Sequence, residues 1–264
     1  MLRFDKVCFG YDAGSIIRDV SFEIEAGQCV ALLGENGAGK STLCRLCNGL
    51  LKPSSGTVTL AGKDTRSVRV SDLARTAAYL FQNPDRQICQ NTVREEIMFG
   101  LEYVVSDIEE QRRRCERMLS LFALDPVREP FSMSRGERQQ LALASILARE
   151  PALLILDEPT TGLDYRECML IMEIISRLHK EGTTILMISH DMEVVADFAE
   201  RALVLSKGRL IGDDTVRVLM KNRALLSEAS LLPAQIPALA LELGPGFEDV
   251  FTIDDMLKRI KEAQ

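Results

Sequence analysis

The feature that most constrains this chain is a glycine-rich segment at residues 34–41. It reads Gly-Glu-Asn-Gly-Ala-Gly-Lys-Ser and fits G-x-x-x-x-G-K-[ST], the pattern of a phosphate-binding P-loop. The apolar run 29–33 before it predicts a short buried strand, and residues 42–50 after it predict a helix. Strand, loop and helix in this order indicate an α/β fold built on a P-loop.

The chemistry of the segment follows from its predicted geometry. A helix N-terminus presents unpaired N–H groups and the positive end of its dipole, which attract phosphate. The expected phosphate-binding residues are Gly34, Glu35, Asn36, Gly37, Ala38, Gly39, Lys40, Ser41 and Thr42. We expect Lys40 to reach the β- and γ-phosphates and the Ser41 hydroxyl to ligate Mg²⁺. The motif alone predicts nucleoside triphosphate binding and leaves kinase, GTPase and transport ATPase open.

Charge and hydropathy narrow the classes of partner. The 264 residues carry a net charge of −7, which argues against nucleic acid as the main partner. No apolar run is long enough to span a bilayer, and Met1–Lys6 is charged where a signal peptide would be apolar. We therefore expect a cytoplasmic protein that can dock on a membrane protein.

Cysteine usage agrees with a reducing compartment. The chain has seven cysteines at scattered positions, which predicts free thiols. Cys44 and Cys47 form a C-x-x-C pair on the predicted P-loop helix, with no second pair to complete a metal site. We expect them to be small buried residues.

The order of predicted elements indicates a parallel α/β sheet with an inserted helical lobe. Strands and helices alternate, and the apolar run 152–156 is typical of a central parallel strand. Residues 92–125 are predicted to be helical, and Ser134 and Glu137 form an S-x-x-E capping box that opens another helix. The region from about 86 to 148 lacks strand patterns. Beyond about 215 the pattern is helical again, with a last amphipathic helix on Ile253, Met256, Leu257 and Ile260.

Two acids end the central strand, where open α/β sheets bind ligands. Asp157 is suited to hold Mg²⁺ through water, and Glu158 is suited to orient and deprotonate an attacking water; solvation of a strand end is the plainer alternative. His190 ends another strand at the same predicted edge. Tyr11 lies in a turn-rich segment, 10–14, where its ring can stack on a base or serve only the turn.

At this point residues 2–215 resemble the ATP-binding-cassette (ABC) ATPases of transporters. Residues 34–42 match Walker A, and Asp157 and Glu158 match Walker B with its catalytic carboxylate. The resemblance implies that Tyr11 stacks on adenine and that His190 is the switch histidine. It further implies that Gln82 contacts Mg²⁺ and water and senses the membrane partner.

Two more segments carry the resemblance. Thr161-Gly162-Leu163-Asp164 matches the D-loop. Ser134-Arg135-Gly136-Glu137 falls where the family has Ser-Gly-Gly-Gln, its signature. In this family two cassettes pair head to tail, so each ATP lies between one Walker A and the opposite signature. Arg135 and Glu137 depart from the pattern, and Arg135 would cost more than glycine if its backbone needed a positive φ. We expect an altered signature that is still able to act.

A narrower resemblance is to the ATPase subunits of energy-coupling-factor (ECF) and cobalt-type importers, which take up vitamins or transition-metal ions. Residues 81–87 with 92–93 and 99–100 carry it. The tail around Leu232-Pro233 and residues 251–260 is similar to the C-terminal extension of those subunits, which aids dimerisation.

The expected fold is an α/β P-loop NTPase of the ABC type. It has a RecA-like core, a helical subdomain at about 86–148 within an ATPase domain 1–215, and a small C-terminal helical extension at 216–264. The expected activity is ATP hydrolysis with ATP and Mg²⁺, by a peripheral subunit at the cytoplasmic face of the membrane that energises an importer.

Its partners would be integral membrane subunits and a second ATPase subunit. We hypothesise a heterodimer with unequal sites, with a homodimer as the alternative. The rival function is a soluble ABC ATPase of DNA repair or cluster assembly.

Overall fold

The structure is a computed structural model that describes residues 1–11, 14–247 and 249–262. Within these residues the larger sheet has six strands in the order β10-β9-β3-β8-β7-β6. Their bounds are β3 Cys29–Leu33, β6 Ala77–Leu80, β7 Leu153–Asp157, β8 Thr184–Ile188, β9 Arg201–Ser206 and β10 Arg209–Thr215. All pairings are parallel except that of β10 with β9. The predicted parallel sheet is therefore present, with one antiparallel edge strand.

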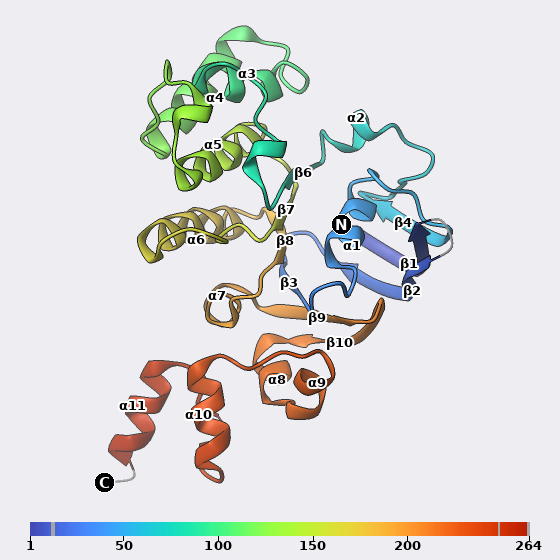
Figure 1. The fold of residues 1–264 in the computed structure, drawn as a ribbon, viewed down its shortest axis with the longest axis vertical. Helices are drawn as coiled ribbons and strands as arrows, with labels where there is room; N and C mark the ends of the chain where they lie inside the picture. Colours follow the sequence, from blue (N-terminus) through green and yellow to red (C-terminus); the bar gives the residue numbers. More distant parts are fainter. Residues whose placement is uncertain (12–13, 248, 263–264) are drawn as a thin grey trace.

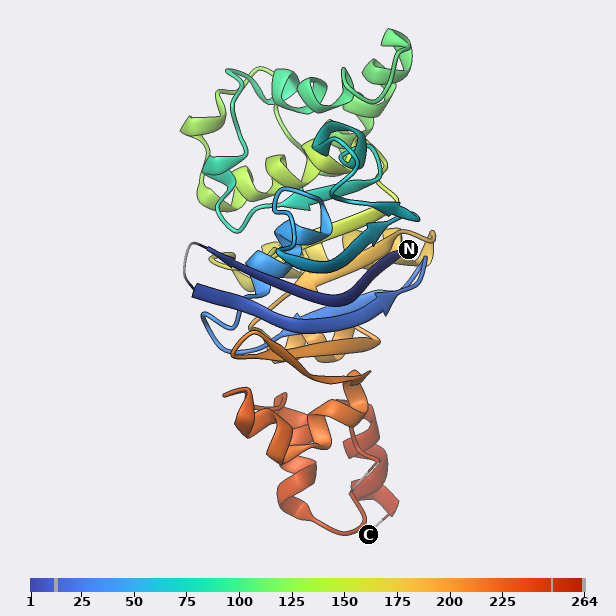
Figure 2. The same ribbon diagram turned by 90° about the vertical axis from the view of Figure 1, so that its right-hand side faces the viewer.

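A second, antiparallel sheet lies beside the first (Figures 1 and 2) and was not predicted. Its order is β2-β1-β4-β5, with bounds β1 Leu2–Tyr11, β2 Gly14–Ile24, β4 Ser55–Leu60 and β5 Lys63–Asp64. The predicted loop 10–14 is shorter than expected, because Tyr11 pairs with Gly14 across the hairpin. Asp12 and Ala13 lie outside the described residues.

The helices fall into three groups in Figure 1. Helices α3, α4 and α5 form a lobe at one end of the molecule, α6 and α7 cover one face of the larger sheet, and α8 to α11 gather at the opposite end. The bounds are α1 Lys40–Cys47, α2 Val70–Leu73, α3 Val93–Leu101, α4 Ile108–Leu121, α5 Arg135–Leu147, α6 Tyr165–Lys180, α7 Met192–Phe198, α8 Val216–Lys221, α9 Arg223–Glu228, α10 Gln235–Leu243 and α11 Ile253–Glu262. Short 3₁₀ turns occupy Pro84–Arg86 and Pro130–Ser132.

The region 92–125 that was predicted to be helical contains two helices, α3 and α4. Asp107 starts the second one by accepting a hydrogen bond from the N–H of Glu109. An aspartate at this position satisfies a backbone donor that the helix itself leaves unpaired.

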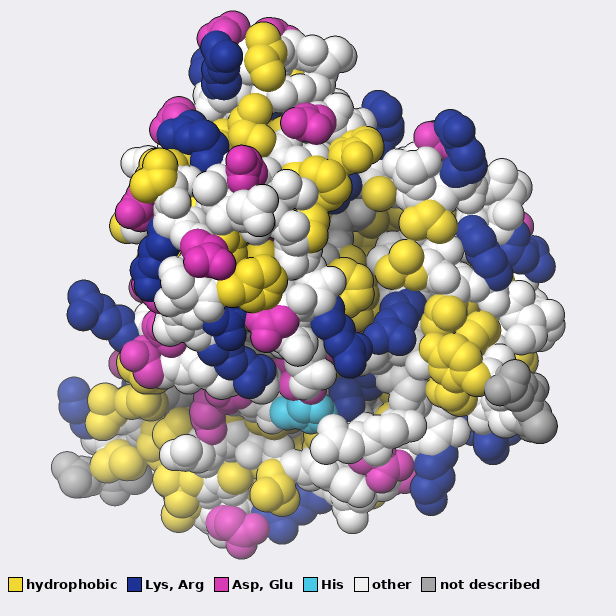
Figure 3. Space-filling model, turned by 45° about the horizontal axis from the view of Figure 1, so that its top comes forward, with side chains coloured by type: hydrophobic (Ala, Val, Ile, Leu, Met, Phe, Trp, Pro, Cys, Tyr) yellow, Lys and Arg dark blue, Asp and Glu magenta, His cyan; other side chains and the backbone are white. Residues whose placement is uncertain are grey.

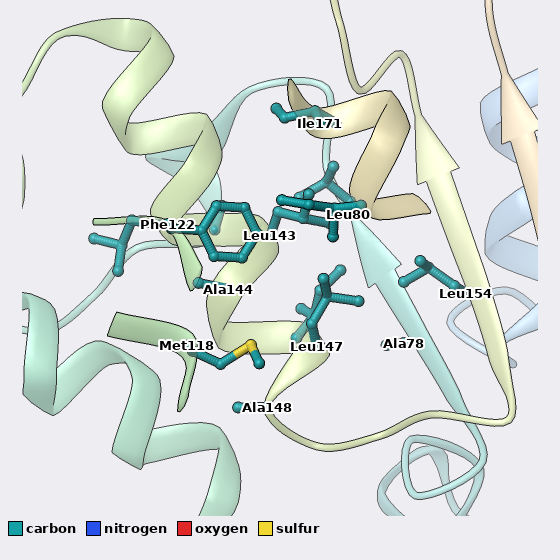
Figure 4. Packing of buried hydrophobic residues seen from close by; sticks show 14 of the residues in the cluster. Ala78, Leu80, Met118, Phe122, Leu143, Ala144, Leu147, Ala148, Leu154 and Ile171 are labelled. Atoms are coloured by element: carbon teal, nitrogen blue, oxygen red, sulfur yellow. The ribbon is translucent and has the colours of Figure 1, made fainter. Parts of the chain in front are cut away.

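Helix α5 joins the helical lobe to the larger sheet. Figure 4 shows Leu143 and Leu147 of α5 between Phe122, which follows α4, and the sheet residues Leu80 and Leu154. All five side chains are at most 5% exposed. Truncating a leucine in such a core costs about 2–5 kcal/mol, so this packing holds the C-terminal half of α5 against the larger sheet.

The C-terminal helices attach to the sheet through a separate apolar cluster. Val216 and Phe251 are buried with Ala31 of β3 and Val204 of β9. The predicted amphipathic helix is present as α11, but only one residue of its apolar stripe is buried. Met256 is buried, whereas Ile253, Leu257 and Ile260 are 64%, 50% and 43% exposed. Within residues 1–11, 14–247 and 249–262, no helix combines the length and apolar character needed to cross a membrane.

Candidate functional site

The candidate site lies at one edge of the larger sheet, where the parallel strands β6, β7, β8 and β3 end side by side. Gln82 follows β6, Glu158 follows β7, His190 follows β8 and the P-loop follows β3. Figure 3 shows basic side chains along a hollow of the molecular surface, with acidic side chains and a histidine beside it. Residues that are far apart in the sequence therefore meet because their strands are neighbours.

The P-loop ends in a helix whose first turn is open to a ligand. Helix α1 begins at Lys40, two residues before the predicted start, and Gly39 caps it with φ 105° and no side-chain hydrogen bond. That backbone conformation favours glycine. The first N–H groups of α1 thus face outward without a side-chain acceptor, which is the arrangement that accepts an anion.

The Lys40 side chain forms hydrogen bonds with the backbone of its own P-loop. Its Nζ donates to the carbonyl oxygens of Gly34 at 2.7 Å and Glu35 at 3.0 Å. Burial lowers the pKa of Lys40, and the negative charges of Glu158 and Asp157 act in the opposite direction. The ammonium group is therefore held among carbonyl oxygens and near two carboxylates, so an added phosphate would find a desolvated cation already in place.

Asp157 is held from two sides. Ser41 Oγ donates to its Oδ1 at 3.3 Å, and the Tyr79 hydroxyl donates to its Oδ2 at 2.6 Å. Burial, with nearby negative charge, raises the pKa of Tyr79, so the phenol keeps its proton and remains a donor. Sequence reasoning missed Tyr79, because the pairing of β6 with β7 that brings it to Asp157 leaves no local signal in the sequence.

One hydroxyl and one carboxylate at this spacing fit a partly hydrated Mg²⁺ that also binds phosphate oxygens. Ser41 supplies the hydroxyl and Asp157 the carboxylate, and Ser41 Oγ lies 3.3 Å from Asp157 Oδ1. The residues present therefore fit the expected cation.

Glu158 is the centre of the polar network. Its Oε2 accepts from Gln82 Nε2 at 2.6 Å and from Thr161 Oγ1 at 2.9 Å, and its Oε1 lies 2.8 Å from His190 Nε2. Its side chain is 12% exposed. The structure thus brings together Gln82, Glu158 and His190, the residues expected to act in catalysis.

The altered signature forms the N-terminus of α5. Ser134 accepts from the N–H of Glu137, and Glu137 accepts from the N–H of Ser134, which is the predicted capping box. Arg128 donates to both carboxylate oxygens of Glu137. Arg135 is the first residue of the helix and has no positive φ, so the backbone cost considered for an arginine here does not arise.

Two other expected ligand residues have local partners. Tyr11 ends β1, is 45% exposed and meets the ring of Phe9 edge to face at 5.0 Å. Asp164 caps α6 by accepting from the N–H of Glu167 at 2.8 Å. The contacts described for these two side chains do not reach the P-loop, so their nucleotide contacts stay predictions.

A family model described as ABC transporter matches residues 17–161, more than half of the chain. A protein of Caldanaerobacter subterraneus subsp. tengcongensis, named as an ABC transporter ATP-binding protein, is 42% identical over 98% of this chain and 46% of its own length. A protein of Pyrococcus abyssi with the same type of name is 36% identical over 98% of this chain and 99% of its own.

This chain covers 46%, 43% and 42% of the length of three of the curated relatives that it matches, and so spans less than half of each. Among solved structures, an ATP-binding cassette seen as a dimer in a post-hydrolysis state with ADP and Pi has a TM-score of 0.75 and 26% identity. The match covers 82% of this chain and 99% of that cassette.

CbiO1 of Clostridium perfringens, part of the ABC transporter complex cbiONQ, has a TM-score of 0.77 and 28% identity. The match covers 92% of this chain and 98% of CbiO1. The sequence matches and the structural matches indicate the same family. The chain belongs to the ABC transporter family of ATP-binding proteins, and its fold is that of an ATP-binding cassette.

Proposed function

We propose that this chain is the ATP-hydrolysing subunit of a membrane importer of the ECF or cobalt type, bound peripherally at the cytoplasmic face. The observation that carries the proposal is the meeting of Lys40, Glu158 and His190 at the ends of neighbouring strands. Cation, general base and base-orienting group are the parts that phosphoryl transfer to water needs. The cargo would be a vitamin or a transition-metal ion.

In the proposed reaction the P-loop binds the phosphates of ATP. Lys40 and the N–H groups of α1 neutralise them, and Ser41, Asp157 and Gln82 would hold Mg²⁺, which offsets charge on the phosphates. Glu158 takes the proton of the attacking water. His190 and Thr161 fix the direction of its carboxylate, so that the base is oriented before water arrives.

A second cassette would complete the site. The first turn of α5, Ser134–Glu137, would face the γ-phosphate bound by the partner, because the dipole of a helix N-terminus favours an anion. The division into an ATPase domain 1–215 and an extension 216–264 is part of this proposal. Exposed Ile253, Leu257 and Ile260 of α11 are apolar surface suited to the second ATPase subunit.

The membrane subunit would dock in a groove between α2, α3 and α5. The groove has a volume of about 270 Å³ and is lined by Ser71, Ala74, Gln87, Glu96, Phe99, Gly100, Tyr103, Val104, Ser145, Ile146 and Arg149. Phe99 and Tyr103 are exposed at its rim, with ring centroids 5.6 Å apart. Gln87 lies in the groove wall, and Gln82 of the same segment bonds to Glu158. Docking and catalysis would thus share one short segment.

The similarity to CbiO1 supports the importer assignment. The rival remains a soluble ABC ATPase of DNA repair or cluster assembly. Purification of the tagged chain from detergent-solubilised membranes, followed by reconstitution in vesicles, separates the two. The importer proposal expects integral proteins to co-purify and ATP to drive uptake. A chain that turns over ATP but recovers no integral protein from the membrane fraction would contradict it and favour the rival.

A further inference from the structure

The first turn of α5 contacts the loop 158–164 of the same chain. A Cβ added to Gly162 would lie within 3.4 Å of Cζ, Nε and Nη1 of Arg135, so the guanidinium lies beside that glycine at the surface. Beside it, a Cβ added to Gly136 would lie 2.3 Å from Oε1 of Glu167. Gln139 Nε2 donates to the Pro159 carbonyl at 3.3 Å. The altered signature is therefore in contact with its own D-loop.

The same loop holds the proposed general base. Thr161 donates its hydroxyl to Glu158 Oε2 at 2.9 Å, and its N–H donates to the Glu158 carbonyl at 3.3 Å. Thr161 is the immediate neighbour of Gly162. Any displacement of Gly162 would therefore move one of the hydrogen-bond donors that orient the carboxylate.

We propose that Arg135 is a positioning residue for Glu158 of its own chain, acting through Gly162 and Thr161. Its guanidinium reaches from α5 to the loop and lies next to a residue that has no side chain, at φ 80°. A glycine at position 135 would leave that gap open. The contact holds Thr161 against the carboxylate.

The inference rests on the proposed function, in which the first turn of α5 faces the ATP bound by the other cassette. Arg135 then contributes to two sites. Its helix faces the nucleotide bound by the partner, and its side chain positions the catalytic base of its own chain. A movement of α5 when the partner binds or hydrolyses ATP would change the position of Glu158 through Gly162 and Thr161. The two hydrogen bonds of Lys40 Nζ are made to carbonyl oxygens of its own loop.

The test uses a dimer in which the other cassette carries a glutamine in place of its catalytic glutamate. In a homodimer this is a mixed dimer with Glu158→Gln in one copy. The remaining active site then contains this chain's Glu158 and the partner's signature, while this chain's Arg135 faces the silent site. A change in turnover caused by Arg135 must therefore travel through its own chain.

In that dimer we expect Arg135→Ala to lower kcat about 10-fold with KM for ATP unchanged, since a small misplacement of a catalytic group is costly. On a Thr161→Val background the same substitution should have no further effect. Arg166→Ala, which removes an exposed arginine on α6, serves as the matched control and should leave kcat unchanged. If Arg135→Ala does not fold, Arg135→Met keeps the length and removes only the guanidinium.

Unchanged kcat in Arg135→Ala, or an equal loss in the presence and absence of the Thr161 hydroxyl, would overturn the inference. Failure of the proposed function is seen separately. It would appear as no ATP turnover by the parental dimer, before any change at Arg135 is made.

Discussion

The Nε2 atom of His190 lies 2.8 Å from Oε1 of Glu158. The two residues are 32 positions apart by number, and they meet because β7 and β8 pair in parallel with Asp157 opposite Ile188. The Glu158 N–H also donates to the Ile188 carbonyl at 3.0 Å. Backbone pairing therefore sets the distance between imidazole and carboxylate, and the side-chain contact fixes the direction of the carboxylate.

The first prediction follows from that contact. His190→Ala should leave ATP affinity unchanged and lower kcat by about 10²-fold, because the carboxylate loses one of the groups that orient it. Steady-state turnover and equilibrium nucleotide binding measure the two effects. A variant with the parental kcat would show that the 2.8 Å contact has no role in catalysis.

The second prediction concerns the P-loop cation. Lys40→Ala should abolish tight ATP binding, because the charge over the phosphates is lost along with two bonds to loop carbonyls. Calorimetry measures the affinity, and thermal unfolding without nucleotide reports whether the loop change harms the fold. An affinity equal to that of the parent would mean that this loop is not the phosphate site.

The third prediction concerns coupling through residues 82–90. Asp85 accepts a 2.7 Å hydrogen bond from Arg138 of α5, which ties the segment to the helical lobe. Asp85→Asn or Arg86→Ala should reduce ATP-driven uptake more than basal ATP turnover. Glu109→Gln, which weakens an exposed ion pair with Arg112 of α4, is the control. Parallel losses of uptake and turnover, or no loss in either, would exclude a coupling role.

The fourth prediction concerns the pH dependence of the cap on α5. The Ser134 N–H and the Arg128 guanidinium hold the pKa of Glu137 below its ordinary value of 4.5. A carboxylate with a lowered pKa stabilises the fold above its unfolded pKa, and this stabilisation is lost as pH falls through the folded value.

The difference in Tm between the parent and Glu137→Gln should therefore be constant near neutral pH and shrink below about pH 4.5. Thermal unfolding of both proteins across the range from pH 7 to pH 3 measures it. A difference that does not change with pH would show that the charge of Glu137 does not stabilise the cap.

Local patterns were sufficient to predict the strand ends and caps. The P-loop spacing predicted a helix directly after the loop, although α1 begins at Lys40, two residues earlier than expected, and the Ser134…Glu137 spacing predicted the capping box. Both depend on residues at most a few positions apart. The apolar run before Asp157 predicted a central strand for the same reason, because a strand covered on both faces is apolar throughout.

Contacts that depend on tertiary pairing were not predictable from the chain alone. The antiparallel sheet requires β1 to pair with both β2 and β4, and such pairings leave no local signal. The bond from Tyr79 to Asp157 and the packing of Arg135 on Gly162 join segments 78 and 27 positions apart. The periodicity of a strand predicts which of its side chains are buried, but it does not predict which strand pairs with it.

The central claim is that Glu158 is the base that activates water for ATP hydrolysis. Single-turnover hydrolysis with the parent and Glu158→Gln, at saturating ATP and Mg²⁺, tests it most directly. We expect Glu158→Gln to bind ATP as the parent does and to hydrolyse it about 10²–10⁴-fold more slowly, a rise of roughly 3–5 kcal/mol in the barrier. A single-turnover rate in Glu158→Gln equal to that of the parent would contradict the claim.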